Sequence, residues 1–420
     1  MTENNGARPR GRIAITGLGA ITPVGNDVRS SWESCREGRS GTGMITRFDS
    51  SELPVHIAAE VKGFDPEAAL GHKEARRTSR VIQFALIAAR EAVADSGLDT
   101  ASIADDVGVI IGSGIGGLDV VEAASITVHE RGWRRVSPFT VPNLIPDMAA
   151  GMVAIDHRLK GPNFCVVSAC SSGAHSVGEA AETIRRGDAV AMLAGGTEAG
   201  ITKVGIAAFA VAQALSRRND DPEHSSRPFD KDRDGFVTGE GACVMMLEDW
   251  DHAIARNARI YAELVGYGAT ADANHITQPD PDGDGARRCI ERALKRAGRR
   301  PDEVDYVNAH GTGTELNDVA ETKALKTVFG DAAYRIPVSS TKSMTGHLLG
   351  AAGAFEAMVC VLAMYDKYLP PTINLDTPDP ACDLDYIPNV GRTAAPKLTI
   401  STSFGFGGHN SCLALAAVDA

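Results

Sequence analysis

An internal repeat constrains the fold of this 420-residue chain more than any other feature of its sequence. The stretch Glu91–Gly97 with Asp106–Gly114 is echoed by Arg292–Gly298 with Glu303–Gly313. Two shorter pairs follow in the same order: Val166–Cys170 with Val338–Lys342, and Gly239–Val244 with Gly407–Cys412. Chance similarity among Gly-, Ala- and Val-rich segments is the alternative for any single pair. Three pairs in one order, too long for a solenoid period, predict two similar halves, at residues 1–255 and 256–420.

Short apolar runs alternate with helical patterns along both halves. Five runs read as buried strands, at residues 12–16, 107–111, 165–168, 189–193 and 242–247. Helical spacing occurs at residues 81–96 and 176–186. The most apolar stretch, Leu348–Met364, is shorter than a membrane span and contains Glu356, so we expect a buried core helix. This alternation predicts an α/β fold.

The charge balance and the cysteines exclude several classes of protein. Lys and Arg number 42 against 54 Asp and Glu, a net charge of −12, which argues against nucleic-acid binding. Eight irregularly spaced cysteines do not suit a disulfide scaffold. No apolar leader precedes the first predicted strand. We therefore expect a cytoplasmic protein that binds neither membrane nor nucleic acid.

Two segments of the chain resemble ligand-binding motifs but do not meet all the requirements of those motifs. Gly112–Gly117 has the spacing of a dinucleotide-binding turn, but we expect Glu130, at the distance of the acidic partner, to lie in a charged loop. Asp230–Gly235 resembles the start of a calcium loop, but Gly241 stands where the bidentate Glu is needed. The cysteines and histidines also lack zinc spacing. We expect neither a dinucleotide nor a metal site.

Cys170 is the cysteine whose context indicates chemistry. It lies where a predicted strand turns directly into a helix, and the free N–H groups there favour a thiolate and lower the thiol pKa. Such a thiolate is a covalent nucleophile that forms thioesters. The alternative, a cysteine packed as a small apolar residue, is our expectation for the following positions: Cys165, Cys243, Cys289, Cys360, Cys382 and Cys412.

Two histidines in the second half supply partners for this thiol. His310 and His347 both lie in Gly-rich turns beyond predicted strands, and Lys342 precedes His347. Either histidine alone has a structural alternative, but together their Nε2 donors suit the stabilisation of an enolate. A backbone N–H of the Gly405–Gly408 turn and that of Cys170 would form an oxyanion hole. The set favours carbon–carbon bond formation on thioesters over hydrolysis.

These motifs resemble a known family over nearly the whole chain. SACSSG around Cys170, NAHGTGT around His310, STKSMTGHLLGAAGA with Lys342 and His347, and SFGFGGHN are similar to those of elongating 3-oxoacyl-[acyl-carrier-protein] synthases. These beta-ketoacyl synthases are condensing enzymes of the thiolase superfamily. The resemblance implies a thiolase-like five-layered α/β fold made of two duplicated halves.

The resemblance also implies a ping-pong reaction. Cys170 takes the acyl group from its carrier, malonyl-carrier loses CO2 with His310 and His347 stabilising the enolate, and the carbanion attacks the acyl thioester. The N–H groups of Cys170 and Phe406 would form the oxyanion hole, and Lys342 and Glu321 an ion pair that supports the site. The remaining implied contacts are with substrate: Thr277, Thr312 and Thr314 with phosphopantetheine, Phe404 as the gating aromatic, and Ile115 and Phe209 in the acyl pocket.

The implied partner is an acyl carrier protein, whose phosphopantetheine bears the substrates, and no other cofactor is implied. An acidic carrier needs a local basic surface, for which the candidates are Lys73, Arg76, Arg77, Arg134 and Arg135. A solvated charged face is the alternative. We expect either a homodimer or a heterodimer with a chain-length-factor homologue.

Fatty-acid elongation and a catalytic ketosynthase subunit of a discrete polyketide or polyene system both remain open. Gln213 and His409 depart from common family residues, an Arg and a Thr, and similar replacements occur in some polyketide and polyene ketosynthases. A biosynthetic thiolase would need a second catalytic Cys in the Gly405–Gly408 turn, which contains none. A non-catalytic scaffold would not need Cys170 and both histidines.

Overall fold

The computed structural model describes residues 11–418. The polar segment at residues 1–10, on which the expectation of no leader rests, lies outside them. Within the described residues, ten strands form one mixed sheet with the order β10-β9-β13-β14-β8-β1-β7-β6-β4-β5. Its strands are β1 Ile13–Ile21, β4 Val107–Gly112, β5 Asn163–Phe164, β6 Ala191–Glu198, β7 Gly241–Asp249, β8 Ala262–Ala271, β9 Tyr306–Asn308, β10 Val338–Ser339, β13 Leu398–Gly405 and β14 His409–Ala416. Two short pairs lie outside it: β2 Gly43–Met44 with β3 Ile57–Ala58, and β11 Tyr368–Leu369 with β12 Arg392–Thr393.

The sheet consists of two five-stranded halves with the same internal order. Strands β1, β7, β6, β4 and β5 of the first half correspond to β8, β14, β13, β9 and β10 of the second. The halves join at β1 and β8, where Ala14 faces Glu263 and Ile15 faces Ala262. The duplicated α/β fold that the repeat predicts is therefore confirmed.

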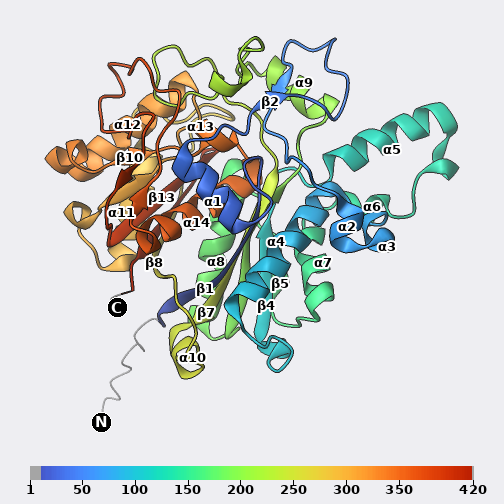
Figure 1. The fold of residues 1–420 in the computed structure, drawn as a ribbon, viewed down its shortest axis with the longest axis horizontal. Coiled ribbons are helices and arrows are strands. Elements are labelled where there is room, and N and C mark those ends of the chain that lie inside the picture. The colour runs from blue at the N-terminus through green and yellow to red at the C-terminus, as the bar shows by residue number, and fades with distance from the viewer. Residues whose placement is uncertain (1–10, 419–420) are drawn as a thin grey trace.

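Helices complete five layers around these two half-sheets (Figure 1). Helices α8 and α14 pack on each other between the halves, α4 and α7 cover the outer face of the first half, and α11 and α12 cover that of the second. The longer helices are α1 Val28–Glu37, α4 Arg80–Ser96, α5 Leu118–Arg131, α7 Met148–His157, α8 Ser172–Arg186, α9 Lys203–Val211, α11 Asp284–Ala297, α12 Glu315–Phe329 and α14 Ala352–Tyr365. The shorter ones are α2 Pro66–Leu70, α3 His72–Ala75, α6 Thr140–Leu144, α10 Trp250–Ala255 and α13 Lys342–Thr345.

Glycines at equivalent positions of the two halves allow the outer helices to approach the sheet closely. A Cβ on Gly19 of β1 would lie 1.9 Å from the carbonyl oxygen of Ala88 in α4. A Cβ on Gly268 of β8 would lie 2.1 Å from that of Cys289 in α11. Both distances are far below contact, so each half requires glycine where its outer helix crosses the central pair of strands.

Two predictions of local structure are wrong. Residues 165–168 are not a strand, because β5 ends at Phe164 and lies at the edge of the sheet, where no further strand of the chain continues the ladder. Residues 129–131 are not a loop but the last turn of α5, which begins directly after the Gly112–Gly117 turn. The core helix expected at Leu348–Met364 is confirmed as α14, in which every residue but the last is buried.

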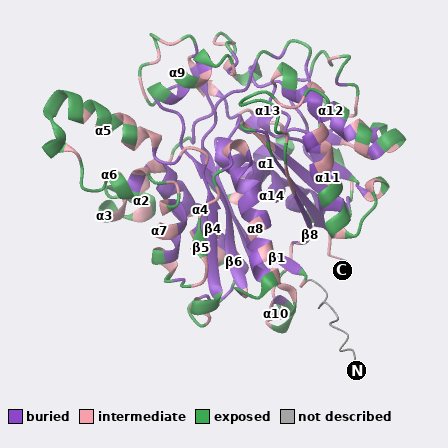
Figure 2. Cartoon of the chain, turned by 180° about the vertical axis from the view of Figure 1, so that it is seen from behind, coloured by how far each residue is buried: buried purple, intermediate pink, exposed green. Residues whose placement is uncertain are grey.

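Helix α5 projects from the body of the protein and buries none of its residues (Figures 1 and 2). Exposed apolar side chains continue from it to the edge strand: Val121, Ile126, Val128, Trp133, Phe139, Val141, Ile145, Ile155, Phe164 and Val167. We call residues 118–167 the edge segment. No helix of the described residues is long and apolar enough to cross a membrane.

Candidate active site

A small cavity of about 80 Å³ brings together residues from both halves of the chain. Nine of the residues singled out from the sequence line it: Cys170, Phe209, Thr277, His310, Thr312, Thr314, His347, Phe404 and Phe406. Ile115 does not line it but packs with Cys170 and Phe209 in the apolar cluster beside it. Segments up to about 240 residues apart in the sequence therefore converge on one thiol.

Cys170 lies in a short 3₁₀ turn, Ala169–Ser171, directly before α8. The turn is fixed to the second half, because Ser171 Oγ donates to the carbonyl groups of Ser403 and His409 at 3.0 and 2.8 Å. Gly405 is required beside it, since a Cβ there would lie 2.7 Å from the carbonyl oxygen of Ser168. The N–H groups of Phe406 and Cys170 itself approach the sulfur.

The pKa of Cys170 is raised rather than lowered, contrary to the prediction. Burial raises the pKa of the thiol to about 12, and the nearby charge of Lys342 and the two N–H groups offset only part of that cost. The prediction considered the helix N-terminus but not the cost of desolvating the thiolate among the side chains of the cavity. In this state the side chain is a protonated thiol.

The two histidine rings pack edge to face at the cavity. Their ring centroids lie 5.3 Å apart, and the His310 ring lies 5.6 Å from that of Phe404. Both ring nitrogens of His347 and Nδ1 of His310 are buried without a hydrogen-bond partner among the described residues. Burial, followed by the charge of Lys342, holds both pKa values well below the ordinary range. Both imidazoles are therefore neutral and free to bind a substrate oxygen.

Lys342 pairs with Glu356 of α14, and the expected ion pair with Glu321 is wrong. The Lys342 ammonium contacts the Glu356 carboxylate, and both side chains are almost fully buried. Burial raises the pKa of Glu356 to about 7, although the lysine acts in the opposite direction. The sequence contains a signal for this partner, because Glu356 is a carboxylate within an otherwise apolar helical stretch.

Glu321 positions His310 instead. Its carboxylate accepts hydrogen bonds from the N–H groups of His310 and Gly311 at 2.9 and 2.8 Å and from Thr402 Oγ1 at 2.7 Å. These three donors occupy the carboxylate, which explains why Lys342 turns toward α14. Glu321 thus fixes the backbone of the His310 turn without facing the cavity.

Hydroxyl groups line the cavity beyond the histidines. Thr312 and Thr314 are hydrogen-bonded to each other through their hydroxyls at 2.9 Å, and Thr277 is exposed. These polar groups lie on one cavity wall, whereas Phe209, Phe236 and Phe404 contribute aromatic surface. The cavity therefore has the mixed lining that a polar arm ending in a thioester requires.

Family models match most of the chain. The model described as "Beta-ketoacyl synthase, N-terminal domain" matches residues 10–253, and "Beta-ketoacyl synthase, C-terminal domain" matches residues 261–376. The chain belongs to the beta-ketoacyl synthase family. It is 52% identical over 404 residues to "3-oxoacyl-[acyl-carrier-protein] synthase 2" of Synechocystis sp., covering 96% of this chain and 97% of that protein.

Two solved beta-ketoacyl synthase structures share the fold. One is a beta-ketoacyl synthase from Burkholderia phymatum, with a TM-score of 0.91 and 37% identity over 97% of this chain and all of that one. The other is "The ishigamide ketosynthase/chain length factor", with a TM-score of 0.92 and 35% identity over 98% of this chain and all of that one. The thiolase-like fold class is confirmed.

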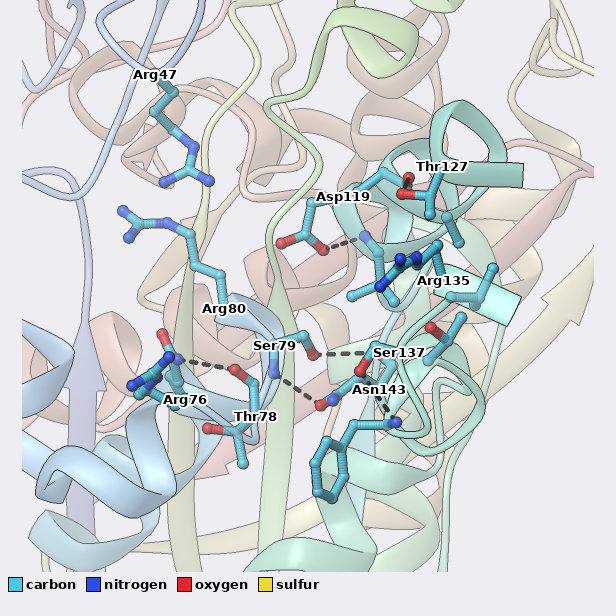
Figure 3. A pocket seen from close by; sticks show the side chains of 17 residues that line it. Arg47, Arg76, Thr78, Ser79, Arg80, Asp119, Thr127, Arg135, Ser137 and Asn143 are labelled. Atoms are coloured by element: carbon cyan, nitrogen blue, oxygen red, sulfur yellow. Dashed lines mark hydrogen bonds between the residues drawn. The ribbon is translucent and has the colours of Figure 1, made fainter. Parts of the chain in front are cut away.

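The basic residues singled out from the sequence gather around a second pocket of about 520 Å³ (Figure 3). Arg76 and Arg135 line it, together with Arg47 and Arg80. The other three lie nearby: Arg77 stacks over Phe139 of the same pocket, Arg134 over Trp133, and Lys73 lines the adjoining pocket with Arg77. This pocket shares no lining residue with the catalytic cavity.

The segment that resembles a calcium loop makes contacts within the protein. Asp230 accepts hydrogen bonds from the N–H groups of Asp232, Asp376 and Thr377, so its oxygens are occupied by backbone. Among residues 11–418, no group of three His, Cys, Asp or Glu is arranged to hold a metal ion. All eight cysteines are free, as the irregular spacing predicts.

Proposed function

We propose that this protein catalyses the decarboxylative Claisen condensation of malonyl-carrier with an acyl group held on Cys170, giving a 3-oxoacyl-carrier and CO2. One observation carries the proposal: a single thiol shares a cavity with two neutral imidazoles, and both ring nitrogens of His347 and Nδ1 of His310 are buried without a hydrogen-bond partner among the described residues. A hydrolase would use one base and a water, and would leave the second imidazole without a task.

In the first half-reaction Cys170 Sγ attacks the carbonyl carbon of an acyl-carrier thioester. The N–H groups of Cys170 and Phe406 stabilise the tetrahedral oxyanion. The carbon–sulfur bond to the pantetheine breaks, and the thiol proton passes to the departing thiolate. The product is an acyl-Cys170 thioester.

In the second half-reaction malonyl-carrier loses its carboxylate. The electron pair of the breaking carbon–carbon bond moves into the thioester carbonyl, and Nε2–H of His310 and of His347 stabilise the resulting enolate oxygen. The enolate carbon attacks the acyl-Cys170 carbonyl, Cys170 leaves as a thiolate, and it then takes up a proton. Neutral imidazoles suit this task because a donor that keeps its proton stabilises the enolate without quenching it.

Fatty-acid elongation is the pathway that we favour. The chain is 52% identical to a 3-oxoacyl-[acyl-carrier-protein] synthase 2 but 35% identical to a ketosynthase of a chain-length-factor complex, at similar coverage. The second candidate, a discrete polyketide ketosynthase, rests on that structural likeness and on Gln213 and His409. We propose a cytoplasmic enzyme without a metal or cofactor of its own, its substrates borne on phosphopantetheine that contacts Thr277, Thr312 and Thr314.

We propose that an acidic acyl carrier protein docks on the basic surface around the second pocket. Arg76 and Arg135 line this pocket (Figure 3); Arg76 Nη1 lies 3.4 Å from His72 Nε2, and neither guanidinium group pairs with a carboxylate among the described residues. Unpaired guanidinium groups are available to the carboxylates of a partner and accelerate its encounter. The docking candidates are Lys73, Arg76, Arg77, Arg134 and Arg135.

We further propose a homodimer formed through the edge segment. Strand β5 ends the sheet with an unpaired edge, and Phe164 and Val167 are 40% and 57% exposed beside it. An open apolar edge with a helix that buries none of its residues needs a partner surface. A second copy offers the same edge and the same helix in a two-fold arrangement. A heterodimer with a homologue is the alternative outcome of the sedimentation test below.

Separating the two half-reactions tests the condensation. Incubation with acyl-carrier and malonyl-carrier should give a 3-oxoacyl-carrier and release CO2. His310→Ala and His347→Ala should retain acyl-Cys170 and lose CO2 release, because neither imidazole is needed as the nucleophile. Acyl-carrier hydrolysis without a condensed product would contradict the proposal, and graded acyl lengths with and without a homologous partner distinguish the two pathways.

A further inference from the structure

A buried carboxylate close to the catalytic cavity has no part in the reaction described above. Glu198, the last residue of β6, is fully buried. Its Oε1 accepts hydrogen bonds from Ser113 Oγ at 2.8 Å and the Ile115 N–H at 3.3 Å. Its Oε2 accepts them from the N–H groups of Gly114 and Gly350 at 2.8 and 3.0 Å. The carboxylate thus occupies the donors of the Gly-rich turn that imitates a dinucleotide site.

These four donors belong to two different turns. Ser113, Gly114 and Ile115 follow β4 in the first half, whereas Gly350 follows His347 in the second. The turns are in direct contact, because a Cβ on Gly350 would lie 2.4 Å from the Gly114 nitrogen. One carboxylate therefore joins the Ile115 turn to the His347 turn, with an oxygen shared between the two halves.

Each of the two turns contributes one apolar side chain, Ile115 or Leu349, to the cluster beside Cys170, and we call this pair the apolar wall. Ile115 and Leu349 pack in the same cluster as Cys170 and Phe209. Both side chains converge on Gly200, where an added Cβ would lie 3.5 Å from Ile115 Cδ1 and 3.2 Å from Leu349 Cδ1. Leu349 is held at a φ of 50°, a conformation that a branched side chain rarely adopts without support from its surroundings.

The size of the cavity makes this wall important for an acyl chain. About 80 Å³ holds a few water molecules, since roughly 10–15 Å³ of such volume corresponds to one water. Side chains around the thiol must therefore yield to a long alkyl chain on Cys170, and Ile115 and Leu349 belong to the apolar cluster against which Cys170 packs. The distance that these side chains can move depends on how firmly hydrogen bonds hold the two turns that bear them.

We propose that Glu198 is a positioning residue for acyl-chain selection: by tying the Ile115 turn to the Leu349–Gly350 turn, it sets the depth available to the acyl group on Cys170. Glu198 touches neither thiol nor substrate and acts through these two turns. The inference rests on the proposed condensation, whose acyl-Cys170 intermediate defines the chain to be selected.

The test is Glu198→Gln. The amide of glutamine places an NH2 where one carboxylate oxygen stood, so the backbone N–H groups bonded to that oxygen lose their acceptor at nearly unchanged volume: Ile115 on one side, or Gly114 and Gly350 on the other. Acylation of Cys170 is measured with hexanoyl-carrier and palmitoyl-carrier. We expect the palmitoyl-to-hexanoyl ratio of rates to change by about tenfold or more, the discrimination typical of altered contacts in an apolar pocket. The rate of malonyl-carrier decarboxylation should change by a smaller factor than the palmitoyl-to-hexanoyl ratio.

Glu91→Gln is the matched control. Glu91 of α4 is a partly buried carboxylate that accepts hydrogen bonds from the backbone N–H groups of Ala20 and Val28, both at 2.9 Å. It should lower the melting temperature without changing the chain-length ratio. If Glu198→Gln lowers the melting temperature and leaves the ratio as Glu91→Gln does, Glu198 is only structural and the proposal is wrong.

A second variant keeps the test decisive if Glu198→Gln does not fold. Gly200→Ala adds a methyl group against the flexible ends of Ile115 and Leu349 and leaves the carboxylate intact. It should slow palmitoylation of Cys170 more than hexanoylation, and an unchanged ratio would contradict the proposed wall. Absence of any acyl-Cys170 in the wild-type protein would instead refute the proposed function, so the two failures are distinguishable.

Discussion

Replacing Lys342 with methionine removes the cation that pairs with Glu356 and leaves the carboxylate inside the protein. The two side chains are 1% and 2% exposed, so water does not substitute for the ammonium group. Breaking a buried pair by removing one partner costs about 3–5 kcal/mol of folding free energy. The lysine already compensates only part of the burial of Glu356, because the pKa of that carboxyl is about 7 instead of 4.5.

The size of this loss depends on pH. Burial raises the pKa of Glu356 from 4.5 to about 7, so the folded protein disfavours the ionised carboxylate. The folded protein holds this proton more tightly than the unfolded chain, so Glu356 lowers the free energy of unfolding as pH rises from 4.5 through 7. Without Lys342 the pKa of Glu356 rises further, so the free energy of unfolding keeps falling up to a higher pH. Lys342→Met should therefore cost less stability at pH 5.5 than at pH 8.

Urea unfolding at fixed protein concentration measures these differences. Adding Glu356→Gln to Lys342→Met should recover about 1–3 kcal/mol, since the pair is replaced by neutral groups. Adding Glu321→Gln should recover none, because Glu321 is engaged with the backbone of His310 and Gly311. A larger recovery with Glu321→Gln than with Glu356→Gln, or a cost that does not grow with pH, would refute this reasoning.

Four further predictions follow from the site and the surfaces. His347→Ala should slow malonyl-carrier decarboxylation by about 10²–10³-fold while acylation continues; an equal loss of both would contradict its role. Iodoacetamide labelling of Cys170 should still rise above pH 9, because burial raises the thiol pKa to about 12; a plateau near pH 8 would contradict it. Arg76→Glu with Arg77→Glu should raise KM for acyl-carrier without changing that labelling, and an unchanged KM would count against carrier docking. Val167→Asp should convert the dimer to monomer in sedimentation velocity; a wild-type monomer, or a dimer unaffected by the change, would contradict the proposed edge contact.

The duplicated halves and the three central residues of the site were predictable because local sequence patterns indicate them. The repeat preserves the order of strand, turn and helix, so it predicts which elements correspond. Cys170 directly precedes a helix, and His310 and His347 lie in Gly-rich turns, the kind of position where an α/β fold gathers its functional groups. These contexts, together with the family resemblance, predicted that the three residues act together, and all three line one cavity.

The remaining features depend on distances across the fold that local patterns do not encode. The half that contains Lys342 has three buried carboxylates, those of Asp318, Glu321 and Glu356, and only the helix geometry directs the lysine to Glu356. Glu198 lies at the end of an apolar strand, and its partners come from two turns about 240 residues apart. The thiol pKa likewise follows from the desolvation of Cys170 by residues that converge from both halves, which the helix N-terminus alone does not reveal.

Intact-protein mass spectrometry tests the central claim most directly. After incubation with an acyl-carrier substrate, the wild-type protein should gain the mass of one acyl group, and peptide mapping should place it on Cys170. Cys170→Ala should gain none, whereas Cys165→Ala, which changes another partly exposed cysteine, should behave as wild type. An acyl adduct that persists in Cys170→Ala would contradict the assigned nucleophile and with it the proposed condensation.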